Sequence, residues 1–238
     1  MAFVASLNSR FYVGTAAWAA YARGYSQQVD ADMLEITTLA DAAKAFIPGQ
    51  LSGTVSLDLL LDTAAAAGGE FATMNTWKTT PQVVTFAPRG TTRGNETWNI
   101  LANQSQASIM SAVADVVTAA VTIQADGSVD AGVVLDPETA ITANTNGTSV
   151  DNGAATTNGG VGHLHVTAFS GLTSDSVVVE HSTDNSAWST LATFTSVTGT
   201  TSERLVVAAG TTVNRYLRIR DAVTGTGSCT RFVSFARR

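Results

Sequence analysis

Apolar and polar residues alternate along several short stretches of this chain, which is the pattern of strands that bury one face. The clearest case is residues 54–61, where Val55, Leu57 and Leu59 alternate with polar side chains. Similar patterns predict strands at residues 11–13, 29–38, 82–86, 107–113, 116–124 and, after a turn at 125–127, up to residue 135. The first part of the chain is therefore predicted to consist mainly of strands.

One stretch departs from this alternation and has a helical period. Leu39, Ala42, Ala43 and Phe46 are spaced as i, i+3, i+4 and i+7, so a helix would place them on one face. A threonine precedes the stretch and is suited to cap a helix, and a Pro-Gly pair follows it closely. The sequence therefore predicts one short helix at residues 39–46.

Residues 137–160 divide the chain, because they contain mostly Thr, Asn, Ala and Gly and almost no bulky side chain. This composition predicts a linker or a loosely ordered loop. Beyond it, six short strands are predicted at residues 163–169, 176–182, 187–194, 201–208, 214–221 and 230–236. Short strands at this spacing favour a β-sandwich. The predicted organisation is a first domain at 1–136, the linker, and a second domain at 161–238.

The composition is poor in charge: 13% of the residues are charged and 45% are apolar. Much of the surface must then be formed by Ser, Thr, Asn, Ala and Gly, which lose water at a lower cost than unpaired charges do. Such a surface favours large contacts between subunits. The alternative is a surface protein with a coat rich in Ser and Thr.

The net charge of −6 lies entirely in residues 1–136, which hold twelve acidic and six basic residues, whereas the remainder holds seven of each. Tight binding to nucleic acid requires clustered Lys and Arg that neutralise phosphates. The first part of the chain has no such cluster, so a nucleic-acid-binding protein is not predicted. The terminal arginines Arg231, Arg237 and Arg238 are predicted to be a solvated edge.

The candidate chemistry is sparse. His163 and His165 lie two residues apart and could ligate a metal, but no third ligand is near in sequence. His181, Ser182 and Asp184 carry the groups of a catalytic triad, although a polar turn explains them more simply. Cys229 is the one cysteine, which excludes a disulfide within the chain. We therefore predict no catalytic residue, no metal and no cofactor, and hence a protein that is not an enzyme.

Several short motifs of the first part resemble the major tail tube proteins of bacteriophages with long, non-contractile tails. The motifs are LEITT at 34–38, Asp41, AFIPG at 45–49, Gly53 and the strand at 55–62, and the resemblance extends over residues 11–136. It implies a mainly β fold: a tail-tube-type β-sandwich or barrel with one flanking helix, followed here by a smaller all-β sandwich domain. It also implies six-membered rings that stack into a tube, with a long loop between rings at residues 64–78 or 88–104.

A tail tube subunit would be part of the virion, assembled in the host cytoplasm. The resemblance implies other copies of the chain, a tape measure protein and a tail terminator as partners, and genomic DNA that passes without tight binding. A negative lumen would repel DNA phosphates. The acidic residues predicted to face such a lumen are Asp58, Asp62, Asp115 and Asp126.

The second part resembles the added sandwich domains at the C-termini of some tail proteins and, more loosely, discoidin-type galactose-binding-like folds. The matching segments are EHSTD at 180–184, RYLRI at 215–219 and RFVSFAR at 231–237. The resemblance implies a domain on the outside of the tube that contacts host surface glycans through Trp188 and Tyr216. Packing of Trp188 against its own sandwich is the alternative for that residue. For the whole chain, the alternative function is a secreted or surface carbohydrate-binding β-sandwich protein.

Overall fold

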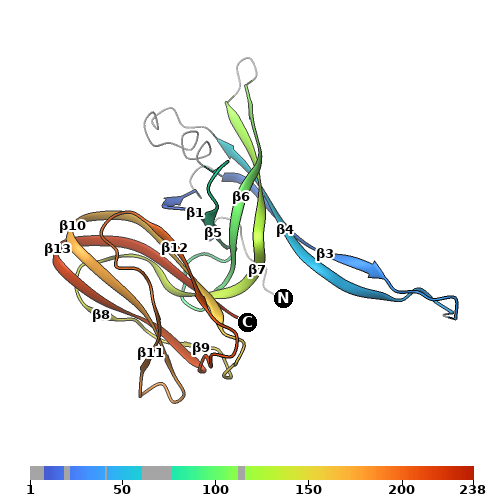
Figure 1. Cartoon of the computed structure of the whole chain (residues 1–238). Coiled ribbons are helices and arrows are strands. Elements are labelled where there is room, and N and C mark those ends of the chain that lie inside the picture. Colours follow the sequence, from blue (N-terminus) through green and yellow to red (C-terminus); the bar gives the residue numbers. More distant parts are fainter. Residues whose placement is uncertain (1–7, 19–21, 41, 61–76, 112–115) are drawn as a thin grey trace. The chain divides into compact units, whose positions relative to one another are not determined.

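The computed structural model describes residues 8–18, 22–40, 42–60, 77–111 and 116–238 (Figure 1). Within these ranges the regular structure consists of strands that pair antiparallel, and no α-helix occurs. The predicted mainly β fold is confirmed, whereas the flanking helix is not seen. The described residues also contain no helix of the length and apolarity needed to cross a membrane.

The chain forms two compact units that are each discontinuous in sequence. Unit 1 contains Met1–Ala20, Gln82–Asn99 and Asp130–Arg238, and unit 2 contains Tyr21–Pro81 and Ile100–Val129. Strands β6 (Glu96–Met110) and β7 (Thr118–Ile141) contribute residues to both units. The predicted domain boundaries at residues 136 and 160 stay a prediction.

Two long strands, β10 (Gly160–Ser182) and β13 (Tyr216–Arg237), form the centre of unit 1. They pair from Gly160↔Arg237 to Ser182↔Tyr216. The strands paired directly with these two are β11 (Ser189–Thr193) and β12 (Ser202–Val207) on β10, and β8 (Thr145–Asn146), β9 (Val150–Asp151) and the end of β7 on β13. Segment 137–160 therefore also contains strand residues, and their backbone groups pair with β13.

Strands β10 and β13 each unite two strands that the sequence predicts separately. The glycines between the predicted strands are bulges and not turns: Gly171 has φ 75° and Gly225 has φ 95°, and the register shifts beside them. A Cβ atom on Gly171 would lie 2.7 Å from the carbonyl oxygen of Thr226, so glycine allows the two strands to stay paired there. Bulges bend a strand without ending it.

Both halves of the bent strands contribute to the hydrophobic core of unit 1. Leu164 and Val179 come from the two ends of β10, and both are fully buried. The same cluster includes Leu135, Val166, Val177, Phe194, Val197, Val213, Leu217, Ile219, Val233 and Phe235. Most of these are inward positions of alternating strands, and Phe194, Val197 and Val213 come from the connections between strands.

A smaller set of strands completes unit 1. Strand β1 (Arg10–Val13) pairs with β5 (Gln82–Ala87) and with β2 (Ala16–Ala17). Tyr12 of β1 is fully buried and stacks on Phe232, with ring centroids 4.5 Å apart. Residues 88–95 connect β5 to β6.

Unit 2 is built on β3 (Ala22–Glu35), β4 (Phe46–Leu60) and the first part of β7. The predicted alternation in β4 is confirmed, because Val55, Leu57 and Leu59 are buried while Ser56 and Asp58 are exposed. Further buried residues of this unit are Trp77, Ile100, Ala102, Ala119, Val121 and Ile123.

The prediction of a helix at residues 39–46 is wrong for the residues that the structure describes. Leu39 is 110% exposed in the connection between β3 and β4, and Phe46 already begins β4. An eight-residue helix is not stable alone and needs a surface to pack against, which this connection does not provide. The turn predicted at 125–127 is also wrong, because β7 runs without a break from Thr118 to Ile141 and accommodates Gly127 at φ 97°.

Candidate functional site

The outer halves of β3 and β4 form a two-stranded ribbon, residues 29–35 and 46–53, that we call the arm. Strand β7 pairs with β4 only at residues 54–60, so among the described residues the arm has no third strand (Figure 1). Isolated two-stranded ribbons are marginally stable in water. The arm is therefore the part of unit 2 with the least support from its own core.

One face of the arm is apolar and continues the buried face of the sheet. Gln27 pairs with Val55, so Val29, Ala31 and Met33, which follow in steps of two along β3, lie on the same side as the buried Val55. The arm stripe, as we call this surface, consists of Val29, Ala31 and Met33 with the partner-strand residues Phe46, Pro48 and Leu51. All six side chains are exposed, Met33 at 58% and Leu51 at 62%.

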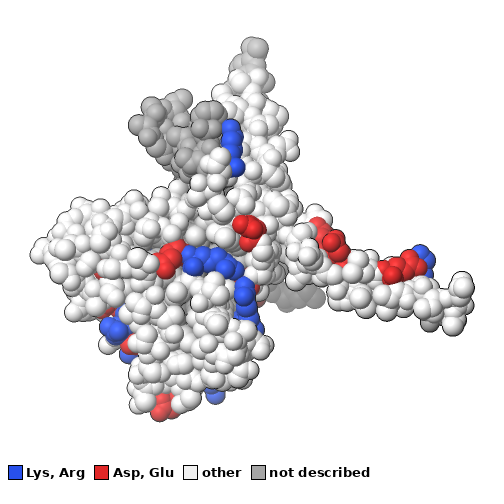
Figure 2. Space-filling model, viewed as in Figure 1, with Lys and Arg blue, Asp and Glu red and all other residues white. Residues whose placement is uncertain are grey.

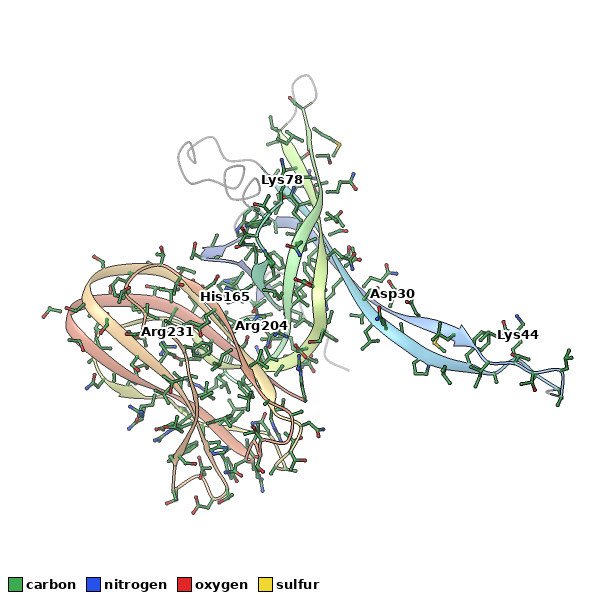
Figure 3. All side chains as sticks on the ribbon, in the orientation of Figure 1. Asp30, Lys44, Lys78, His165, Arg204 and Arg231 are labelled. Carbon is green, nitrogen blue, oxygen red and sulfur yellow. The ribbon has the colours of Figure 1, made fainter. Side chains whose placement is uncertain are left out.

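The energetic consequence follows from the size of these side chains. Full burial of one Leu, Phe or Met contributes about 1.5–3 kcal/mol. The polar residues near the stripe do not oppose such burial: Asp30 pairs with Ser52 on the other face, and Glu35 is ion-paired with Lys44 at 3.1 Å (Figure 3). The arm thus presents a surface whose burial is favourable and leaves no charge unpaired.

The outward face of the β3–β4–β7 sheet has the opposite character. The residues that share this face are Gly24, Ser26 and Gln28 of β3, Thr54, Ser56 and Asp58 of β4, and Ala120, Thr122 and Gln124 of β7. Asp58 is the one charged residue among these nine. Thr54 Oγ1 donates to Gln124 Oε1 at 3.0 Å, and Gln124 Nε2 donates to the Gly53 carbonyl at 2.9 Å. This outward face is a polar surface of small side chains without a basic group.

The whole net charge belongs to unit 2. Unit 1 has ten acidic and ten basic residues. Unit 2 has three basic residues and nine acidic ones, namely Arg23, Lys44 and Lys78 against Asp30, Asp32, Glu35, Asp41, Asp58, Asp62, Glu70, Asp115 and Asp126. Acidic side chains are visible along the arm in Figure 2.

All four acids predicted to face a lumen are in unit 2. Asp58 is exposed on the outward face, and Asp126 is exposed on β7. Asp62 and Asp115 lie outside the described residues. The orientation of these acids toward a lumen stays a prediction. So does the loop between rings at 64–78 or 88–104, and residues 64–76 of the first candidate lie outside the described residues.

The two aromatic residues predicted to contact glycans each have a guanidinium group over the ring. Arg218 Cζ lies 4.2 Å from the ring centroid of Trp188, and Arg215 Cζ lies 5.0 Å from that of Tyr216. Glu180 fixes Arg218 by accepting a hydrogen bond from its Nε at 2.8 Å. Stacking of a sugar on Trp188 would have to use the part of the ring that Arg218 leaves open, and glycan contact stays a prediction.

His163 and His165 are fully buried and hydrogen-bonded to one hydroxyl group. His165 Nδ1 donates to the Gly14 carbonyl at 2.8 Å, so Nε2 accepts from Thr85 Oγ1 at 2.9 Å. Thr85 Oγ1 in turn accepts from His163 Nδ1 at 3.0 Å. Burial is the main cause that lowers the pKa of His165 to about 4 and that of His163 well below its usual value. In the described part of the chain no group of three metal-ligating side chains contains them.

The residues that could have formed a triad make a turn. Ser182 Oγ donates to Asp184 Oδ1 at 2.9 Å, and the same carboxylate oxygen accepts the backbone N–H groups of Ser186 and Ala187. His181 Nδ1 accepts the N–H of Asn214 at 3.3 Å instead of contacting Ser182. The simpler explanation by a polar turn is confirmed.

A buried ionic cluster is the polar feature that sequence reasoning missed. Arg231 was expected in a solvated edge, but it is fully buried and pairs with Asp136 at 2.9 Å, with Asp175 and with Asp221. Asp136 also accepts a hydrogen bond from Arg93 at 2.6 Å. Asp136 and Asp175 come from β7 and β10, and Asp221 comes from the other half of the bent β13, so no local pattern points to the cluster.

Comparison with known proteins gives weak structural similarities. No family model matches the chain, and no curated protein matches it. The tube–sheath complex of an extracellular contractile injection system has a TM-score of 0.44 at 18% identity, over 55% of this chain and 92% of the other. The SPP1 tail tube has a TM-score of 0.41 at 8% identity, over 53% and 77%. The Dit protein of phage SPP1, described as a hub of the adsorption apparatus in phages that infect Gram-positive bacteria, has a TM-score of 0.39 at 9% identity, over 96% and 98%.

Proposed function

We propose that this chain is a structural, non-enzymatic subunit of a bacteriophage tail that assembles with copies of itself into stacked hexameric rings. The observation that carries the proposal is the arm stripe: six exposed apolar residues on a ribbon that leaves the core of unit 2. A surface of this kind gains stability when another molecule covers it. The tail-tube-like motifs of residues 11–136 include parts of the arm itself, since LEITT and AFIPG flank its end.

The outward face of unit 2 is suited to line a conduit for DNA. It offers no Lys or Arg in the paired registers, and unit 2 carries the entire net charge of −6. DNA adheres to proteins mainly through cationic groups that release counterions from phosphates. A wall of Ser, Thr and Gln with a negative bias lets DNA pass without adhering.

In this function the protein resides in the virion tail, and its partners are a tape measure protein inside the tube and a tail terminator at its end. The second predicted domain, residues 161–238, is displayed outside and contacts host surface glycans. Trp188 and Tyr216 are the residues proposed for that contact.

Electron microscopy and analytical ultracentrifugation of the purified full chain test the assembly. We expect rings or hollow tubes whose abundance increases with protein concentration. A chain that sediments as a monomer at all accessible concentrations, with no rings in micrographs, would contradict the proposal.

A further inference from the structure

The second half of β10 and the first half of β13 carry a group of charged and aromatic side chains on their outer face. Val179 and Ile219 of these halves belong to the core, so the residues that alternate with them lie on the opposite face. Glu180 and Arg218 are paired there, and Arg220 follows two residues further along β13. The arginine face, as we call this surface, consists of these three residues and Trp188.

One buried carboxylate fixes both guanidinium groups of the arginine face. Glu180 is 7% exposed, and its Oε2 accepts from Arg218 Nε at 2.8 Å while its Oε1 accepts from Arg220 Nε at 2.7 Å. Arg218 Cζ in turn lies 4.2 Å from the centroid of the Trp188 ring. Because both guanidinium groups bind the same carboxylate, Arg220 lies beside Arg218. The arginine face is therefore one contiguous surface from Trp188 to Arg220, and its cations are held in place.

Arg220 has donors that its own carboxylate partner does not use. A guanidinium group has five N–H donors, and among the described residues Glu180 accepts from the Nε of Arg220. The side chain of Arg220 is 37% exposed, whereas that of Arg218 is 18% exposed. The paired or adjacent positions on the same face are uncharged: Val178, Asn146, Ser176 and Ala222. No acidic side chain at these positions competes for the Nη groups of Arg220.

We propose that the arginine face binds an anionic glycan. The carboxylate or phosphate of the sugar binds the Nη groups of Arg220, and a sugar ring packs on the part of Trp188 that Arg218 leaves open. This rests on the glycan contact of the proposed function and names the class of glycan. Two guanidinium groups share one carboxylate here, so the face has an excess of positive charge in a chain of net charge −6. The planar fork of arginine matches both carboxylate and phosphate.

The surroundings of the arginine face fit a sugar better than they fit a protein or a nucleic acid. Thr190, Thr193 and Asn146 pair with residues of this face and are exposed, so their hydroxyl and amide groups can bind sugar hydroxyls. A protein partner would require an apolar centre, and none of the large exposed apolar residues of the described chain lies on this face. DNA would require a longer row of cations.

An array that pairs each acidic glycan with its neutral counterpart tests this with the full chain. Uronic acids form the carboxylate arm and phosphorylated sugars form the phosphate arm, so the array also identifies the anion. We expect the wild-type chain to bind acidic members, and Arg220→Gln to reduce that binding at least tenfold. Arg89→Gln is the matched control, since it removes one exposed cation elsewhere in unit 1 and should leave binding unchanged.

The Arg220→Gln variant should fold, because Glu180 keeps its pair with Arg218. Circular dichroism of both variants checks this. Equal binding of neutral and acidic glycans, or unchanged binding by Arg220→Gln, would overturn the anionic class of ligand while glycan contact stands. Silence of the whole array would overturn both, whereas rings or tubes in micrographs would still support the proposed assembly.

Two further outcomes would replace the glycan with another occupant. If the wild-type chain retained double-stranded DNA and Arg220→Gln lost it, the face would be a general site for anions. If Arg220→Gln weakened self-association in ultracentrifugation and Arg89→Gln did not, the occupant would be an acidic surface of a second copy. Either result would overturn the proposal of a glycan ligand.

Discussion

Arg231 and Asp175 are both fully buried, and Arg231 Nε lies 3.6 Å from Asp175 Oδ2. Asp136 and Asp221 also contact this guanidinium, so one cation neutralises parts of three carboxylates, with Arg93 assisting at Asp136. Burial raises the pKa of Asp175 and raises that of Asp221 to about 6. Three carboxylates meet two guanidinium groups here, so the cluster carries more negative than positive charge when all three carboxylates are ionised.

Removing the Arg231 cation should therefore strongly destabilise the folded chain. We expect Arg231→Met to lower the free energy of unfolding by about 3–5 kcal/mol, because it leaves buried carboxylates without a counter-charge. The matched control is Arg215→Met, whose ion pair with Asp151 is exposed to solvent and should contribute little to stability. Urea unfolding at pH 7 measures both. Equal effects of the two substitutions would contradict the central role of Arg231.

Two carboxylates of the cluster should respond differently to neutralisation. Asp136 bridges Arg93 and Arg231, so Asp136→Asn should cost about 2 kcal/mol or more at pH 7. Asp221→Asn should cost less than about 1 kcal/mol, because the raised pKa shows that its charged form is already disfavoured. Chemical denaturation of the two variants side by side decides this, and a larger loss in Asp221→Asn would refute it.

The same shift sets the pH dependence of Asp221. Its pKa is about 6 in the folded chain and 3.8 in the reference state, so the folded chain binds the proton more tightly. This stabilisation is fully present below pH 4 and is lost as the pH rises through 6, by about 3 kcal/mol in total. The stability difference between wild type and Asp221→Asn should therefore change in favour of wild type on acidification from pH 7 to 4.

His165 has the opposite dependence. Burial lowers its pKa from 6.5 to about 4, so below pH 6.5 the unfolded chain binds a proton that the folded chain excludes. The stability from neutral His165 is lost as the pH falls from 6.5 to 4, by about 3 kcal/mol. We expect His165→Gln to remove this loss, whereas His181→Gln, at a less buried position, should retain it. Unfolding curves between pH 4 and 7.5 test the comparison.

The outward face of unit 2 offers a test of the conduit. Ser56→Lys combined with Thr122→Lys places cations on neighbouring strands of that face. We expect assembled particles of this variant to retain double-stranded DNA at low salt and to release it as the salt concentration rises. Assemblies with a single added cation on unit 1, Ser196→Lys, should retain none. Binding of DNA by wild-type assemblies would argue against a non-adhesive wall.

Glycan contact by unit 1 is tested on a glycan array. We expect wild-type protein to bind a subset of glycans and Trp188→Ala to lose that binding, while Trp98→Ala retains it. An array without signal for the wild-type chain, or an unchanged signal in Trp188→Ala, would remove the proposed glycan contact.

The sequence predicts structure well where the signal is local. Val55, Leu57 and Leu59 alternate because one face of β4 is buried, and the strand is where that alternation predicts it. The helical spacing of Leu39 and Phe46 is equally regular, but no surface lies there to stabilise a helix. Glycine occurs both in turns between strands and in bulges within a strand. The bulge at Gly171 therefore cannot be distinguished from a turn by sequence.

The buried cluster could not be predicted in the same way. Arg231 and Asp136 lie far apart in the chain, and only the pairing of β13 with β7 brings them together. The arm was partly visible, because Val29, Ala31 and Met33 alternate with polar residues. The sequence does not show that this apolar face continues beyond the part of the sheet that the core of unit 2 buries.

The arm extends beyond its own core, so its strands are best ordered when another molecule covers them. In dilute solution we expect its amide hydrogens to exchange with solvent faster than those of β4 at residues 54–60, where β7 is paired. In an assembly the same amides would be protected. Ordering of the arm and assembly of the subunits would then be one coupled process.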